Sequence, residues 1–239
     1  MKVKVILPIT STIFNEEVVQ EFEFYASPDT EIGMTNLSVG PESIESEYDE
    51  ALCLPDFLAK AIAAEEEGYD AVISDCFADP GVKAAREVLS IPVIGPGEAS
   101  MLYASSLASS FSVVTVLPNV ISMIKNVSKL AGLDCKLASV RYVSIPVLEV
   151  QDKERLVHAL YAEMVRAIEE DHAHALVLGC TGFLGVASEL QERLKDAGYE
   201  VPVIDPAFAS LQLAESLVTM KVKQSRLTYM TPPSKKRTM

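Results

Sequence analysis

The chain has 239 residues, a hydrophobic content of 49% and a net charge of −14 at pH 7. This length can bury a substantial core, and the hydrophobic content argues against disorder. The negative charge argues against nucleic acid and anionic membranes as partners, because faces that bind them need clustered Lys and Arg. The apolar run near the N-terminus is too short for a signal peptide or a membrane span, so we expect a cytoplasmic location.

Short apolar runs rich in Val and Ile predict strands that are buried on both faces of parallel sheets. In chain order these runs are residues 3–7, 71–74, 93–94, 111–117, 175–178 and 203–204. The stretches 58–68, 156–170 and 189–198 have helical character, and Pro80 stands where a further helix could begin. Strands that alternate with helices predict an α/β fold.

The chain also repeats itself, which indicates a duplicated unit. AVISDC at 71–76 matches ALVLGC at 175–180, and IPVIGP at 91–96 matches VPVIDP at 201–206. A weaker pair, VILP at 5–8 and TVLP at 115–118, keeps the same order. The repeat predicts two similar lobes, each with a mostly parallel sheet flanked by helices, related by a pseudo-twofold axis with a cleft between them. Residues 1–96 with 206–239 would form the first lobe, and residues 97–205 the second.

Cys76 and Cys180 end equivalent predicted strands, where open α/β sheets bind ligands. A helix that starts there would lower the pKa of each thiol. The pseudo-twofold axis would bring the two cysteines face to face across the cleft. Racemising a carbon needs a base on one face and an acid on the other, and two opposed thiols supply both. Cys53 and Cys135 have no repeat partner and are interpreted as ordinary cysteines.

Residues beside the two cysteines complete the predicted site. Backbone N–H groups could stabilise the negative charge that develops on a substrate oxygen, and the candidates are those of Phe77, Ala78, Thr181 and Gly182. For Asp75 we favour a structural or indirect role, because adjacent strand residues point to opposite faces. Asp79 is expected to cap the helix near Pro80. No cofactor or metal motif is present, since His172 and His174 lack a further ligand at suitable spacing.

At these residues the sequence resembles the hydantoin racemase branch of the Asp/Glu/hydantoin racemase superfamily, nearly from end to end. The segments that carry the resemblance are GPESIE at 40–45, CFADPG at 76–81, GEA at 97–99, FSVVT at 111–115, IPVLE at 145–149, GCTG at 179–182 and YMTPP at 229–233. The resemblance implies a two-lobed, cofactor-independent racemase whose catalytic pair is Cys76 and Cys180. It implies a small-molecule substrate, a 5-substituted hydantoin or allantoin, and a homo-oligomeric assembly.

One stretch departs from the family pattern. The family usually has Asn-Pro-Asn-Ser/Thr after the first strand, where this chain has Leu7 followed by Pro8, Ile9, Thr10 and Ser11. These four residues, together with Ser43, are expected to contact the substrate. Glutamate and aspartate racemases carry Asp-Ser-Gly at this place, which is also absent, so an amino-acid substrate is not favoured.

Two other functions remain open at this point. A lyase or cis–trans isomerase of the same superfamily would use one cysteine on a small dicarboxylate such as a malonate or maleate. A non-catalytic sensor would bind a small molecule without turnover. The basic C-terminal stretch is interpreted as a solvated, partly ordered tail that includes Lys221, Lys223, Arg226, Lys235, Lys236 and Arg237.

Overall fold

A computed structural model describes residues 1–236 and contains two four-stranded sheets. The first sheet has the strand order β2-β1-β3-β4 and the second has the order β6-β5-β7-β8. Every strand pair is parallel, and adding four to each strand number of the first sheet gives the order of the second. The prediction of two similar α/β lobes is therefore confirmed.

The strands and helices alternate along the chain. The strands are β1 (Lys2–Leu7), β2 (Glu31–Asn36), β3 (Ala71–Ser74), β4 (Val93–Ile94), β5 (Phe111–Thr115), β6 (Leu137–Tyr142), β7 (Leu176–Leu178) and β8 (Val203–Ile204). The helices are α1 (Asn15–Tyr25), α2 (Glu47–Glu66), α3 (Val82–Val88), α4 (Pro96–Leu107), α5 (Ile121–Leu130), α6 (Lys153–Glu169), α7 (Ala187–Asp196) and α8 (Pro206–Thr219). Short 3-10 turns lie at Pro118–Val120, Asp134–Lys136 and Val147–Glu149.

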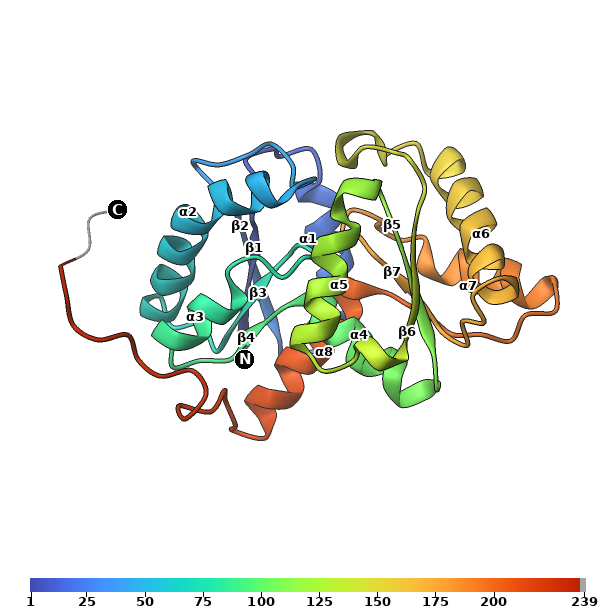
Figure 1. The fold of residues 1–239 in the computed structure, drawn as a ribbon. Coiled ribbons are helices and arrows are strands. Elements are labelled where there is room, and N and C mark those ends of the chain that lie inside the picture. The colour runs from blue at the N-terminus through green and yellow to red at the C-terminus, as the bar shows by residue number, and fades with distance from the viewer. Residues whose placement is uncertain (237–239) are drawn as a thin grey trace.

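Helices cover both sheets (Figure 1). Helices α2 and α3 lie on the outer side of the first sheet and α6 and α7 on the outer side of the second, while α1, α4, α5 and α8 lie between the sheets. Helix α4 packs against β5, β7 and β8, and α8 packs against β3 and β4. These contacts support lobe boundaries at 96/97 and 205/206, which stay a proposal. None of the helices within residues 1–236 combines the length and apolar character needed to cross a membrane.

Two of the four edge strands, β2 and β6, were not predicted from the sequence. Their residues are mostly half-buried, whereas every residue of β3, β5 and β7 is buried. An edge strand contacts a neighbour on one side only, so it needs no continuous apolar run. Helix α2 also begins earlier than predicted, because the Ser46 side chain accepts a hydrogen bond from the Asp49 N–H and caps it.

Part of the basic C-terminal stretch packs against the first lobe. The Arg226 guanidinium donates hydrogen bonds to the carbonyl oxygens of Arg86 and Glu87. Tyr229 accepts a hydrogen bond from the Arg86 guanidinium and lies with its ring against it. The interpretation as a solvated tail is therefore wrong for Arg226, whose charge finds backbone partners at the end of α3. Arg237 lies outside the described residues.

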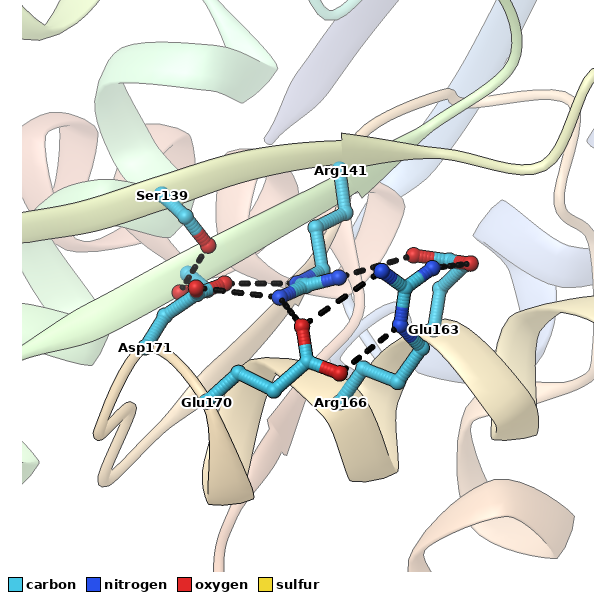
Figure 2. Close-up of polar contacts among 7 residues, drawn as sticks. Ser139, Arg141, Glu163, Arg166, Glu170 and Asp171 are labelled. Carbon is cyan, nitrogen blue, oxygen red and sulfur yellow. Dashed lines mark hydrogen bonds and ion pairs between the residues drawn. The ribbon is translucent and has the colours of Figure 1, made fainter.

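The edge strand β6 is tied to the end of α6 by one arginine (Figure 2). The Arg141 guanidinium lies 2.5 Å from Asp171, 2.7 Å from Glu170 and 3.3 Å from Glu163, and its side chain is 12% exposed. Its hydrogen bonds hold the pKa of the Asp171 carboxyl below the usual range. One cation thus joins three acids of the second lobe.

Replacing Arg141 with methionine is expected to lower the free energy of unfolding by about 1–3 kcal/mol, because three acids lose their shared cation. Urea unfolding at pH 7 measures the loss, and Arg155→Met is the control. The Arg155–Glu149 pair is exposed on both sides, so the control should change the stability by less than about 0.5 kcal/mol.

The stability that Asp171 contributes is present above its unfolded pKa and is lost as the pH falls through its lowered folded pKa. The difference in free energy of unfolding between wild type and Arg141→Met should therefore become smaller below about pH 4. Equal unfolding midpoints for the two variants at pH 7 would contradict this account.

Candidate active site

A cavity of about 60 Å³ lies between the two lobes at the carboxyl ends of the central strands. Sheet register explains its position. Ile6 of β1 pairs with Ser74 of β3, and Val114 of β5 pairs with Leu178 of β7, so the segments that follow these strands meet at one edge of each sheet. Seven of the predicted site residues line it: Ile9, Cys76, Phe77, Ala78, Cys180, Thr181 and Gly182.

The two cysteines occupy equivalent positions. The residue before each one extends the sheet by a backbone hydrogen bond, from the Asp75 N–H to Ile6 at 2.9 Å and from the Gly179 N–H to Val114 at 2.8 Å. Each cysteine then turns into the cavity and is partly buried. The thiols are close enough for charge on Cys180 to raise the pKa of Cys76. The structure therefore brings the predicted pair into one cavity.

The pKa values of both thiols move in the opposite direction from the prediction. Burial raises the pKa of Cys76 well above its ordinary value, and burial raises the pKa of Cys180 to about 12. Helix α3 begins only at Val82 and α7 only at Ala187. The expectation that a helix N-terminus lowers each pKa is therefore wrong, because turns separate the cysteines from the helices and desolvation dominates.

Backbone N–H groups near the sulfurs oppose this effect. The Gly182 N–H lies 3.3 Å from the Cys180 sulfur and donates to it. The Ala78 N–H lowers the pKa of Cys76 in the same way. Both donors stand two residues after their cysteine, so the repeat supplies each thiolate with one hydrogen bond. The other two predicted N–H groups, those of Phe77 and Thr181, do not donate a hydrogen bond to either sulfur.

Four predicted contact residues lie outside the cavity lining. Thr10 is held by Pro41, whose carbonyl oxygen accepts hydrogen bonds from its N–H and its hydroxyl. Ser11 accepts a hydrogen bond from Asn36 through its backbone oxygen. Pro8 is buried and Ser43 is half-buried, and the neighbour of Ser43, Ile44, lines the cavity instead.

Asp79 does not cap the helix that follows it. Helix α3 starts without a side-chain cap, after Gly81 in the left-handed conformation. The Asp79 carboxylate instead accepts hydrogen bonds from the N–H groups of Gly97 at 2.7 Å and Glu98 at 2.8 Å, which open α4. In the repeat, Asp205 caps α8 from the position that corresponds to Gly95. Gly95 has no side chain with which to cap α4, and Asp79 supplies that cap from the preceding loop.

Sequence reasoning missed most of the apolar wall of the cavity. Its side chains come from both lobes and include Phe14, Val18, Ile44, Val120, Met123 and Val147. The spacing of Val120, Met123 and Ile124 indicates one buried helical face, but that pattern predicts burial without distinguishing a core from a cavity wall. Within residues 1–236 no lysine, arginine or histidine lines the cavity, and no cluster of His, Cys, Asp and Glu is placed to hold a metal ion.

The fold and this site define a two-lobed α/β protein with one cysteine from each lobe in a shared cavity. The family model described as Asp/Glu/Hydantoin racemase matches residues 3–214. A hydantoin racemase of Pseudomonas sp. (strain NS671) is 39% identical over 237 residues, which cover 99% of this chain and 93% of that protein. The chain belongs to the Asp/Glu/hydantoin racemase family.

Two solved structures are similar over the whole chain. Allantoin racemase from Klebsiella pneumoniae superposes with a TM-score of 0.92 at 33% identity, covering 100% of this chain and 96% of that one. Allantoin racemase from Pseudomonas fluorescens superposes with a TM-score of 0.93 at 32% identity, covering 100% of both chains. The duplicated architecture is therefore shared with these racemases.

Proposed function

We propose that this protein is an isomerase, a cofactor-independent racemase of 5-substituted hydantoins, with Cys76 and Cys180 as opposed acid and base. The observation that carries the proposal is the pair of thiols, placed by equivalent positions of two repeated lobes in one cavity. The full-length similarity to hydantoin and allantoin racemases supports the same function.

The two proton transfers need only these two groups, because the C5–H of a hydantoin is acidified by the neighbouring carbonyl. One cysteine, as thiolate, removes the C5 proton from its face of the ring. The other, as thiol, delivers a proton to the opposite face and becomes the thiolate, so the roles exchange with the direction of reaction. The N–H groups of Phe77 and Thr181 are the donors that we assign to the oxygen on which charge develops.

The apolar wall favours a hydantoin with an apolar substituent over allantoin, whose substituent is a polar ureido group. Ile9 and Phe14 line the cavity, and burying a polar group against such side chains without partners costs free energy. A dicarboxylate is disfavoured because the lining within residues 1–236 contains no Lys, Arg or His, while the Asp75 carboxyl would repel it. The described lining of the cavity therefore offers a dicarboxylate only backbone N–H and hydroxyl donors, which disfavours the lyase and cis–trans isomerase alternatives.

A substrate panel tests this function. Purified protein is mixed with single enantiomers of 5-isopropylhydantoin, 5-benzylhydantoin, allantoin, aspartate and glutamate, and with maleate. We expect loss of optical rotation with the two apolar hydantoins, weaker turnover of allantoin and none of the other compounds. Turnover of maleate alone would support the isomerase alternative, and binding of a hydantoin without turnover would support the sensor.

Met123 is expected to limit the size of the substituent. It is 3% exposed and separates the site from a neighbouring cavity of about 360 Å³ that it also lines. Met123→Ala should raise the ratio of kcat/KM for 5-benzyl- over 5-isopropylhydantoin about tenfold, by opening this wall. The control Met164→Ala removes an equally buried methionine of α6 outside the site. An unchanged ratio in Met123→Ala would remove this residue from the specificity wall.

A further inference from the structure

The two halves of the site differ at the residue before each cysteine. Asp75 and Gly179 make equivalent backbone hydrogen bonds, but only Asp75 carries a side chain. A β-carbon at Gly179 would lie 2.6 Å from Val113 Cγ1 and 2.9 Å from the Val114 carbonyl oxygen. No acid fits at that position. An exact repeat would place the same residue before both cysteines. The site instead has an acid before Cys76 and a glycine before Cys180.

The single acid contacts the lobe to which it does not belong. Asp75 directly follows β3 of the first lobe, yet its backbone carbonyl oxygen accepts a hydrogen bond from the Thr181 hydroxyl at 3.2 Å. Asp75 is 6% exposed and lines the same cavity as Cys180. Asp75 Oδ1 is buried without a hydrogen-bond partner within residues 1–236. The carboxyl is thus available to act on the cysteine of the opposite lobe.

The titratable groups that face Asp75 are acids, while a hydrogen bond from the Thr181 side chain lowers its pKa. Asp205 at the start of α8 and Glu21 of α1 interact with it electrostatically, and the cation Lys153 faces Glu21. Burial, followed by the charge of Asp205, raises the pKa of Asp75 to about 7. The carboxyl therefore changes its charge near neutral pH without any substrate.

The charges that face the two thiols also differ. Cys180 faces Asp75 and Glu45, and both raise its pKa in addition to burial. Cys76 faces Cys180, Cys53 and Glu50, and Asp75 is not among the main influences on its pKa. The acid that precedes Cys76 in the sequence therefore acts on Cys180 in space.

We propose that Asp75 is a positioning residue that makes the two thiols unequal by controlling the protonation of Cys180. Ionised Asp75 disfavours the Cys180 thiolate by charge repulsion. Protonated Asp75 removes that repulsion, so the two groups titrate as a coupled pair. In turnover, which rests on the proposed function, the reaction direction that starts with the Cys180 thiolate depends on the state of Asp75.

The test measures thiol reactivity and needs no turnover. Iodoacetamide labels the protein at pH 6 to 10, and peptide mapping by mass spectrometry gives a separate rate for Cys76 and Cys180. In Asp75→Asn, Cys180 should react about tenfold faster than in wild type at pH 9, where Asp75 is ionised, with Cys76 changed less than twofold. At pH 6 the two proteins should label Cys180 at nearly equal rates, because Asp75 is protonated there.

The matched control is Glu50→Gln, which removes the acid that faces Cys76. Glu50→Gln should increase the labelling rate of Cys76 and leave the labelling rate of Cys180 unchanged. If Asp75→Asn does not fold, wild type still tests the proposal, because its Cys180 rate should rise less steeply with pH around pH 7 than its Cys76 rate. The proposal would be overturned if Asp75→Asn increased the labelling rates of both thiols equally. It would also be overturned if the labelling rates of Cys76 and Cys180 in wild type rose equally steeply with pH. Because labelling is independent of catalysis, a protein that racemises nothing can still show the coupling.

Discussion

Replacing either Cys76 or Cys180 with serine is expected to reduce racemisation of 5-isopropylhydantoin on the order of 10³-fold. A serine hydroxyl is a much weaker acid than a thiol, so it neither forms the base nor returns the proton at neutral pH. Both variants should lose activity, because each cysteine serves one face of the ring. Loss of optical rotation, followed from each enantiomer, measures the effect.

The control for these variants is Cys135→Ser, since Cys135 is exposed and lies outside the cavity. It should retain full activity. Circular dichroism and urea unfolding establish that the inactive variants are folded. A variant that lost one cysteine but kept near-wild-type racemisation would contradict the two-base mechanism.

Replacing Gly97 with alanine is expected to lower the free energy of unfolding by about 2–3 kcal/mol and to impair catalysis. An added β-carbon would lie 2.3 Å from the Phe77 carbonyl oxygen and 3.1 Å from Asp79 Oδ1. Both atoms belong to the loop that carries Cys76. The first turn of α4 and this loop must therefore separate, which displaces Cys76 and weakens the Asp79 cap.

Urea unfolding and kcat/KM measured on the same preparation test this effect. Ser106→Ala is the control, because Ser106 is an exposed residue of the same helix and the change adds no atoms. It should alter stability by less than about 0.5 kcal/mol. If Gly97→Ala were as stable and as active as this control, the loop of Cys76 would not depend on close packing against α4.

The repeat made the central part of the fold predictable. Strands β3, β4 and β8 lie where the apolar runs placed them, because a strand buried on both faces needs a continuous apolar sequence. The same repeat placed Cys76 and Cys180 at equivalent strand ends. Strands β2 and β6 were not predictable in this way, since their residues are mostly half-buried and include polar side chains.

Side-chain partners between segments far apart in sequence were less predictable. Asp79 precedes a helix, and local pattern therefore suggests that it caps that helix, yet its partners are the N–H groups of Gly97 and Glu98. Strand alternation predicted that Asp75 and Cys76 point to opposite faces, yet β3 ends at Ser74 and Asp75 lines the same cavity as Cys76 and Cys180. The direction of the thiol pKa shifts also depends on how deeply each cysteine is buried. The order of strands and turns along the chain does not reveal this burial.

The central claim is that two thiols act from opposite faces of one carbon, and deuterium incorporation tests it most directly. One enantiomer of 5-isopropylhydantoin is incubated with the protein in D₂O near neutral pH, with an enzyme-free sample to correct for spontaneous exchange. The two enantiomers are then separated by chiral chromatography, and the C5–H content of each is measured by proton NMR. The two-base mechanism predicts that the product enantiomer carries deuterium from the first turnovers while the remaining substrate keeps its proton. Deuterium that enters substrate and product at equal rates would contradict the account, because a single group would then exchange its proton with solvent and serve both faces.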